Sequence, residues 1–219
     1  MTSTPSTLPL LLERSARRAP ERDALIYLEQ RLTYETLLLH VRRAAAGFHA
    51  AGVGPGDRVA LLLPNCPQFV IAFFGALSAG AIVTTTSPLY TLREAIHQWR
   101  DAGAKVVVAD ARLVPLATAA QAECPALERV ILTEDTEYAP DGFPRLAAAL
   151  HGAPLDRLPH GPVHWSDLLR CRPGELPQRA ADDIACLQYT GGTTGTSKGA
   201  MLTHANFWMN IHQTRERLS

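Results

Sequence analysis

Short apolar runs alternate with longer helical patterns between residues 58 and 133, and this alternation constrains the fold more than any other feature. Strands are predicted at 58–63, 81–85, 105–109 and 129–133, with helices at 66–78, from Thr91 onward, and at 113–122. Asn65 is the predicted N-cap of the first helix, and Thr91 with Glu94 forms a capping box for the second. Repeated βα units with short connections predict an α/β fold with a parallel sheet covered by helices.

The regions on either side of this alternation have a different pattern. Upstream, helices are predicted at 8–18 and 34–51, with a small hairpin of strands 24–27 and 31–33 between them. Downstream, residues 138–179 carry seven of the 16 prolines and are interpreted as a long irregular connection with a short helix near 166–169. Strands at 184–189 and 200–203 and a helix from about residue 205 then follow.

This pattern divides the chain into three predicted parts. They are an N-terminal α/β subdomain at 1–137, a Pro-rich irregular connection at 138–180, and a strand–loop–strand unit that starts the next subdomain at 181–219.

Charge, composition and cysteine placement exclude several classes of protein. Lys plus Arg and Asp plus Glu both number 21, so the net charge is zero and no nucleic-acid partner is expected. With 47% hydrophobic and 19% charged residues, the chain is not globally disordered. The four cysteines form no C-x-x-C pair, which favours reduced, buried thiols in a cytoplasmic protein.

Three other patterns point away from common sites. Gly161 and Pro162 separate His160 from His164, which argues against a helical metal site. The glycine-rich turn at 52–56 lacks the third glycine of a dinucleotide-binding fingerprint. The uncharged stretch 59–92 is most apolar over the 15 residues 69–83, fewer than the roughly 20 of a membrane-spanning helix.

The segment 189–199 carries the chemistry of the chain. It contains four glycines, five Thr or Ser hydroxyls and Lys198, which is one of two lysines in the sequence, with Lys105. Glycines let backbone N–H groups approach a ligand, hydroxyls donate to phosphate oxygens, and a lysine neutralises a polyanion. A Walker A loop is excluded because Ser197 precedes Lys198 and Gly199 follows it. A flexible linker has the same composition, but the apolar strands on both sides favour phosphate binding.

Residues 183–204 resemble the phosphate-loop signature of the adenylate-forming (AMP-binding) superfamily, in the order DIACLQYTGGTTGTSKGAMLTH. Within that superfamily they are most similar to bacterial long-chain fatty acid–CoA ligases. Three upstream stretches also resemble the N-terminal region of that family: DRVAL at 57–61, PNCP at 64–67 and SPLYT at 87–91. Ser197 stands where many members have proline. The resemblance implies the parallel βαβ layers of an adenylate-forming N-terminal domain, in incomplete form.

The resemblance implies a two-step reaction. A fatty carboxylate attacks the α-phosphate of ATP to give an acyl-adenylate and pyrophosphate, and the CoA thiol then displaces AMP. The implied ATP-phosphate site consists of Thr190, Gly191, Gly192, Thr193, Thr194, Gly195, Thr196, Ser197 and Lys198. Thr190 is also the implied Mg²⁺ ligand. No catalytic residue is assigned, and structural roles are expected for Lys105 and for His204, the latter at a helix start or in packing.

The resemblance also places the adenine site, the acyl pocket and a catalytic lysine beyond residue 219. We therefore expect an N-terminal part of a ligase with negligible activity by itself, completed by a C-terminal half that could be a separate chain. We also expect the sheet that carries the strand at 184–189 to lack neighbouring strands and so to leave an apolar edge. The expected partners are a fatty acid, ATP and CoA, and peripheral membrane contact stays open.

Other functions remain as alternatives. One is a non-catalytic ATP-binding or assembly module, or one half of a split enzyme. Another is an adenylation domain that acts on an amino or aryl acid, since the phosphate loop does not discriminate between acids. A membrane protein, based on residues 59–92, is the third.

Overall fold

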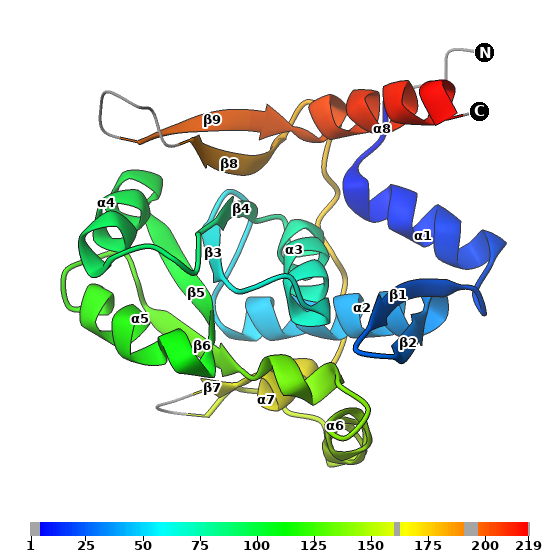
Figure 1. The fold of residues 1–219 in the computed structure, drawn as a ribbon, viewed down its shortest axis with the longest axis horizontal. Helices are drawn as coiled ribbons and strands as arrows, with labels where there is room; N and C mark the ends of the chain where they lie inside the picture. The colour runs from blue at the N-terminus through cyan, green and yellow to red at the C-terminus, as the bar shows by residue number, and fades with distance from the viewer. Residues whose placement is uncertain (1–4, 160–162, 191–196, 219) are drawn as a thin grey trace.

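A seven-stranded sheet forms the centre of the computed structural model, which describes residues 5–159, 163–190 and 197–218 (Figure 1). The strand order is β7-β6-β5-β3-β4-β8-β9. The strands are β3 (Arg58–Leu62), β4 (Ile82–Thr85), β5 (Ala104–Asp110), β6 (Arg129–Thr133), β7 (Val163–His164), β8 (Ile184–Thr190) and β9 (Lys198–Thr203). All neighbours pair in parallel except β8 and β9, which are antiparallel. The predicted α/β fold with a mainly parallel sheet is therefore confirmed.

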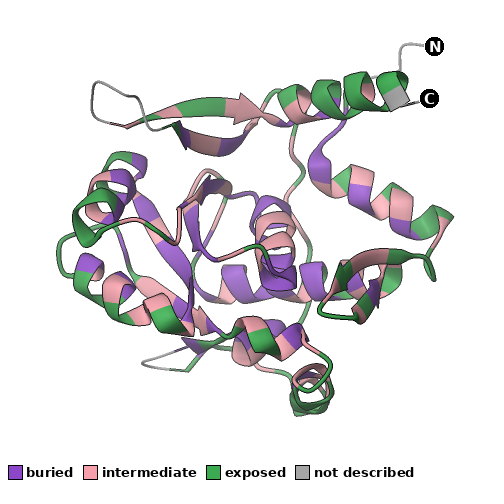
Figure 2. Ribbon diagram, in the orientation of Figure 1, coloured by how far each residue is buried: buried purple, intermediate pink, exposed green. Residues whose placement is uncertain are grey.

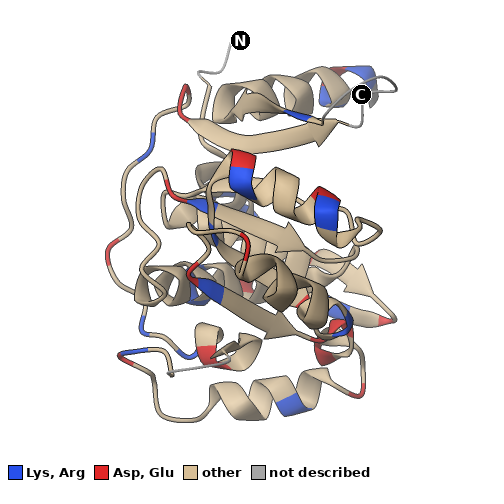
Figure 3. Ribbon diagram, turned by 90° about the vertical axis from the view of Figure 1, so that its left-hand side faces the viewer, with Lys and Arg blue, Asp and Glu red and all other residues tan. Residues whose placement is uncertain are grey.

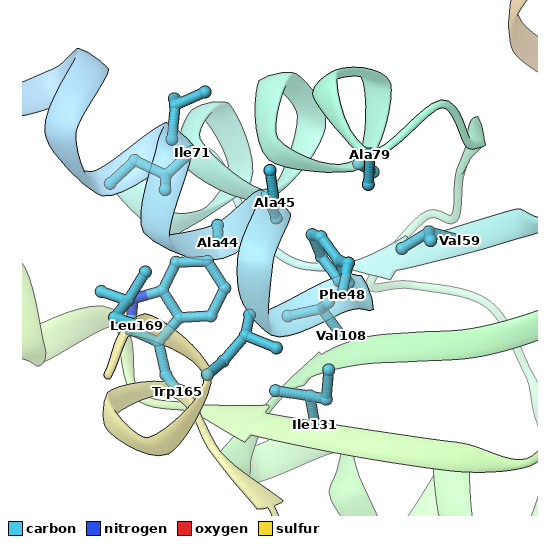
Figure 4. Close-up of a cluster of buried hydrophobic side chains, with 14 of the residues drawn as sticks. Ala44, Ala45, Phe48, Val59, Ile71, Ala79, Val108, Ile131, Trp165 and Leu169 are labelled. Carbon is cyan, nitrogen blue, oxygen red and sulfur yellow. The ribbon is translucent and has the colours of Figure 1, made fainter. Parts of the chain in front are cut away.

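Helices cover both faces of this sheet. One face packs on α2 (Tyr34–Ala50), α3 (Pro67–Ser78) and α7 (Trp165–Leu169), and the other on α4 (Leu92–Ala102) and α5 (Val114–Gln121). Successive residues of β3 alternate between the two cores, with Val59 and Leu61 in the first and Ala60 and Leu62 in the second. Figure 4 shows the first core, where Phe48 of α2 and Trp165 of α7 lie close to strand residues.

The remaining elements lie around this centre. They are α1 (Leu8–Arg18), the antiparallel hairpin of β1 (Asp23–Tyr27) and β2 (Gln30–Thr33), α6 (Phe143–Leu150), α8 (His204–Leu218), and the short 3-10 helices η1 (Ala111–Leu113) and η2 (Asp135–Tyr138). Figure 2 shows burial concentrated in the sheet and the inner helix faces, whereas β9 and α8 are mostly exposed. Basic and acidic residues are interspersed in the view of Figure 3, as a net charge of zero would suggest.

The two predicted helix caps have different outcomes. The capping box of α4 is present, because the Thr91 side chain accepts from the Glu94 N–H and the Glu94 carboxylate accepts from the Thr91 N–H. The prediction of Asn65 as the cap of α3 is wrong, since Cys66 is the N-cap. The reason is Pro67, which takes the first helical position and holds the preceding residue in an extended conformation.

The Pro-rich region contains more regular structure than its composition predicts. Residues 143–150, interpreted as irregular, form the helix α6, with Pro144 in its first turn. A proline is tolerated there because the first turn needs no N–H donor. The short helix predicted near 166–169 is confirmed as α7. The predicted boundaries at 137 and 181 stay predictions.

The expectation that the sheet lacks neighbouring strands around 184–189 is wrong for β8, and β9 is the strand at that end of the sheet. β8 lies between β4 and β9, with Val83 opposite Cys186 in the parallel pair. The free edge of β4 presents unpaired N–H and C=O groups, and β8 satisfies them. The connection through α6 and α7 returns the chain from one end of the sheet to the other, which the local sequence does not indicate.

The thiols and the apolar stretch behave as predicted. All four cysteines are free and buried, and burial raises the pKa of Cys66, Cys171 and Cys186 to about 11. Within the described residues, every helix is too short or too polar to cross a bilayer. The uncharged stretch 59–92 is divided among β3, α3 and β4.

Two buried histidines have hydrogen-bond partners in the folded protein. Trp165 Nε1–H donates to the Tyr138 hydroxyl across 3.4 Å, and that hydroxyl lies 2.8 Å from His40 Nδ1. The Leu8 N–H donates to His204 Nδ1 across 3.3 Å. Burial and the charge of Arg43 lower the pKa of His40 to about 4, and burial and Arg179 lower that of His204 to about 4.

We expect the free energy of unfolding to fall as the pH decreases from 7 to 5. The unfolded histidines have a pKa of about 6.5, so below that pH the unfolded state binds more protons than the folded state. Each histidine contributes at most about 1.4 kcal/mol per pH unit. Urea denaturation at pH 7, 6 and 5 measures the dependence, and His40→Gln should reduce its slope by about half. A pH-independent midpoint in the wild-type protein would contradict this assignment.

Candidate functional site

The β8–β9 hairpin brings the two ends of the Gly/Thr segment together. Thr190 pairs with Lys198, and Tyr189 pairs with Gly199. The Ser197 hydroxyl donates to the Thr190 carbonyl across 3.0 Å. Six predicted site residues lie outside the described residues: Gly191, Gly192, Thr193, Thr194, Gly195 and Thr196. The structure therefore places Thr190, Ser197 and Lys198 of the predicted set, and it brings these three into contact or into register.

Thr190 and Lys198 lie at the carboxyl ends of the parallel strands, where ligands of parallel α/β proteins bind. β4 and β8 run parallel, so the end of β4 at Thr85 and the end of β8 at Thr190 lie on the same edge. Crevices at the carboxyl ends of parallel strands are the usual binding sites of such folds. The exposed Thr190 and Lys198 side chains are accessible to a ligand there.

The two lysines have different surroundings. Lys105 Nζ lies 2.9 Å from Asp57 Oδ2 and donates to the Gly52 carbonyl across 2.6 Å, so the structural role predicted for it is confirmed. Lys198 is exposed, and in the described ranges no carboxylate forms an ion pair with it. An exposed ammonium group that is paired with no described carboxylate is available to an anion.

Gly199 and Tyr189 form a close cross-strand pair at the base of the hairpin. A Cβ on Gly199 would lie 2.9 Å from Tyr189 Cε2, so only glycine leaves room for the ring. The Tyr189 hydroxyl donates to Asp101 Oδ2 of α4. Burial and the neighbouring Asp101 carboxylate raise the pKa of Tyr189, which keeps its hydroxyl protonated as a donor.

Helix α4 and strand β4 supply further contacts to β8 and to the start of β9. His97 Nε2 lies 3.1 Å from the Ser197 carbonyl, and Thr85 Oγ1 donates to Gln188 Oε1 across 3.2 Å. The sequence interpretation missed His97 and Asp101. Their spacing of four residues, on one face of a helix, was the available signal.

The described donor groups fit a polyphosphate. They are a hydroxyl at Thr190 and an ammonium at Lys198, which can both donate to anionic oxygens, whereas the Ser197 hydroxyl donates to the Thr190 carbonyl. Within the part of the chain that is described, no three His, Cys, Asp or Glu residues are arranged to hold a metal ion, and His160 lies outside that part. Thr190 as a Mg²⁺ ligand stays a prediction.

His204 has a packing role, as predicted. It is 1% exposed, begins α8, and its Nδ1 accepts from the N–H of Leu8 in α1. The histidine therefore joins the last described helix to the first.

Comparison with known proteins gives one family and many relatives. Residues 12–218 match the family described as AMP-binding enzyme. The chain is 36% identical over 213 residues to a long-chain-fatty-acid–CoA ligase of Bacillus subtilis (strain 168). This alignment covers 93% of the chain and 38% of the ligase. The chain is also 33% identical over 187 residues to 4-coumarate–CoA ligase 2 of Nicotiana tabacum, in an alignment that covers 84% of the chain and 30% of that ligase.

Solved structures agree with the fold. A benzoate CoA ligase from Burkholderia xenovorans LB400 superposes with a TM-score of 0.74 and 22% identity, over 94% of this chain and 36% of that one. The chain thus spans little more than a third of the length of such relatives. Because the family match extends over residues 12–218, the chain belongs to the AMP-binding enzyme family.

Proposed function

We propose that residues 190–198 hold the β- and γ-phosphates of ATP while a carboxylic acid is activated for transfer to CoA. The observation that carries this proposal is the pairing of Thr190 with Lys198 at the carboxyl edge of the parallel sheet. The family match and the CoA ligases among the relatives support it. The chain spans 38% of the Bacillus subtilis ligase, so the whole reaction is proposed for the assembled enzyme.

In the proposed reaction an oxygen of the acid attacks the α-phosphorus of ATP, and the bond to the β-phosphate oxygen breaks. Pyrophosphate leaves with the electron pair, and the acid becomes an acyl-adenylate, which the CoA thiol then attacks with release of AMP. Lys198 stabilises the negative charge that develops on the leaving pyrophosphate. The Thr190 hydroxyl orients its oxygens, and the Ser197 hydroxyl holds the Thr190 backbone through its hydrogen bond to the Thr190 carbonyl. A bound Mg²⁺, with Thr190 among its ligands, would neutralise further phosphate charge.

The proposed acid is a long-chain fatty acid. The Bacillus subtilis relative, named as a long-chain-fatty-acid–CoA ligase, supports this choice. An aryl acid is the second candidate, supported by the 4-coumarate–CoA ligase relative. Hydroxamate trapping of the adenylate formed by the assembled enzyme, with palmitate and 4-coumarate compared side by side, distinguishes the two. With ATP and CoA as co-substrates and buried, reduced thiols, a cytoplasmic enzyme is proposed.

We expect Lys198→Ala to weaken binding of MgATP to this chain about tenfold. The variant removes a charge-assisted hydrogen bond to phosphate, which contributes roughly 1.5 kcal/mol. Chemical shifts of the Thr190 and Gly199 amides during a MgATP titration give the dissociation constant. Lys105→Ala is the matched control, because it removes the same charge from a lysine whose partner is Asp57. It should lower stability and leave nucleotide affinity within about twofold.

Two results would overturn the proposal. One is equal MgATP affinity in the wild-type chain and in Lys198→Ala. The other is equal loss of affinity in Lys198→Ala and Lys105→Ala. If the wild-type chain binds MgATP but the assembled enzyme forms no adenylate from any acid, the alternative of a non-catalytic ATP-binding module is favoured.

A further inference from the structure

We infer that helix α4 is a clamp that positions the phosphate-binding hairpin by one hydrogen bond to strand β8 and one to the residue directly before β9. His97 and Asp101 are the positioning residues. The expected effect of the clamp on ATP binding rests on the proposed function. The clamp itself rests on the hydrogen bonds between α4 and the hairpin. Neither residue belongs to the Gly/Thr segment, from which each is separated by about 90 to 100 positions in the sequence.

The contact to the second strand involves the backbone. His97 Nε2 lies 3.1 Å from the carbonyl oxygen of Ser197, the residue before β9. A carbonyl only accepts, so Nε2 carries the proton and donates. The bond restrains the main chain directly before Lys198, the residue proposed to meet the phosphates.

The contact to the first strand involves a side chain. The Tyr189 hydroxyl donates to the Asp101 carboxylate, and Tyr189 directly precedes Thr190. Gly199 lies under the Tyr189 ring on the opposite strand, so the ring cannot move inward without contact. This bond therefore fixes the strand that ends at Thr190. His97 and Asp101 are four residues apart, which places them one helical turn from each other on the same face of α4.

The clamp needs a rigid support, and α4 is one. Trp99 is fully buried, and its Nε1–H donates to Thr86 Oγ1 across 3.0 Å. Gln98 Nε2 donates to the Thr85 carbonyl across 2.9 Å and to Thr84 Oγ1 across 3.2 Å. The helix is thus joined to the end of β4, the strand that pairs with β8. One helix therefore holds β4, β8 and the residue directly before β9.

A clamp of this kind raises the affinity for a ligand because it increases the fraction of molecules whose hairpin is in the conformation that binds. A ligand that contacts Thr190 and Lys198 together binds only when both are in register, so its apparent affinity scales with the fraction of molecules in that arrangement. Loss of one anchor from the hairpin lowers that fraction. A neutral or charge-assisted hydrogen bond at this position corresponds to about threefold to tenfold in affinity.

The first test compares three histidine variants of the whole chain. His97→Leu removes the donor to the Ser197 carbonyl and should weaken MgATP binding about threefold to tenfold. His97→Gln retains an N–H donor and should restore affinity to within about twofold of the wild type. His49→Leu is the matched control, because His49 Nε2 lies 3.1 Å from the Ala79 carbonyl, the same bond at the same length but away from the hairpin. It should lower stability and leave MgATP affinity unchanged.

The second test concerns the other strand. Tyr189→Phe keeps the ring over Gly199 but removes the donor to Asp101, and a similar loss of MgATP affinity is expected. Asp101→Asn retains an acceptor oxygen for the Tyr189 hydroxyl, so this variant should keep most of the wild-type affinity for MgATP. The double variant with His97→Leu and Tyr189→Phe should bind more weakly than either single variant, since one bond holds β8 and the other holds the residue directly before β9.

Hydrogen exchange separates the clamp from the ATP proposal. Exchange of the Lys198 and Gly199 amides without nucleotide should accelerate about threefold to tenfold in His97→Leu and not in His49→Leu. If exchange accelerates in this way but wild-type MgATP binding does not depend on Lys198, the clamp holds and the proposed function fails. If Lys198 matters but His97→Leu changes neither exchange nor affinity, the clamp is overturned and the proposed function stands.

Discussion

Replacing Trp165 with alanine is expected to lower the free energy of unfolding by about 4 kcal/mol. Trp165 is fully buried, and it lies in the core between α7 and α2, near Ala44 and Phe48 (Figure 4). The truncation removes the largest side chain of α7 and also the N–H that donates to the Tyr138 hydroxyl. Both the cavity and the lost hydrogen bond from Trp165 to the Tyr138 hydroxyl contribute to the loss.

Trp165→Phe separates the two contributions. It keeps most of the ring volume and removes the N–H donor, so a loss of about 1–2 kcal/mol is expected. Urea denaturation followed by circular dichroism measures both variants. A loss below about 1 kcal/mol for Trp165→Ala would mean that the Pro-rich region contributes little to the core and that α7 is a peripheral element.

The second large effect is expected for Gly47→Ala, which should destabilise the protein by about 3 kcal/mol. Gly47 lies where α2 contacts α7, and a Cβ there would lie 2.4 Å from both Cγ and the carbonyl oxygen of Leu168. The side chain of Leu168 could rotate, but its carbonyl belongs to the backbone of α7, so the helix itself must shift. Helix propensity alone predicts the opposite sign, a gain of about 1 kcal/mol for glycine to alanine.

Thermal denaturation of Gly47→Ala and of a second glycine variant checks this result. Gly174→Ala is the matched control, because a Cβ at Gly174 has no atom within 4 Å and no left-handed backbone to strain. Its stability should stay within about 0.5 kcal/mol of the wild type. A stabilised Gly47→Ala variant would show that α2 and α7 separate easily and that the close approach is not required.

Local sequence patterns predicted the elements of the central sheet well. The apolar strands β3, β5 and β6 and the capping box of α4 depend on residues within a few positions of each other, so a short window contains the whole signal. The α6 helix was missed because prolines were counted without regard to position. Pro144 lies in the first turn, where proline is favourable, and Leu146 of the same helix is buried.

The candidate site also has one part that the local sequence predicted and one part that it did not. The Gly/Thr segment with Lys198 is contiguous, so its residue types together with the apolar strands on either side predicted a phosphate-binding loop. The partners that hold its two ends are distant in the sequence: His97 contacts Ser197 across 100 positions, and Asp101 contacts Tyr189 across 88. Such pairs have no local signature, and either residue alone resembles an ordinary polar residue on a helix surface.

The sequence by itself determined the alternating helices and strands, the buried thiols and the composition of the proposed phosphate loop, because each depends on neighbouring residues. Only the tertiary structure decided that β8 fills the free edge of β4 and that α4 contacts β8 and the residue directly before β9. Those contacts depend on which backbone edge remains unpaired and which helix face remains uncovered after the other elements have packed. That is a property of the whole assembled sheet.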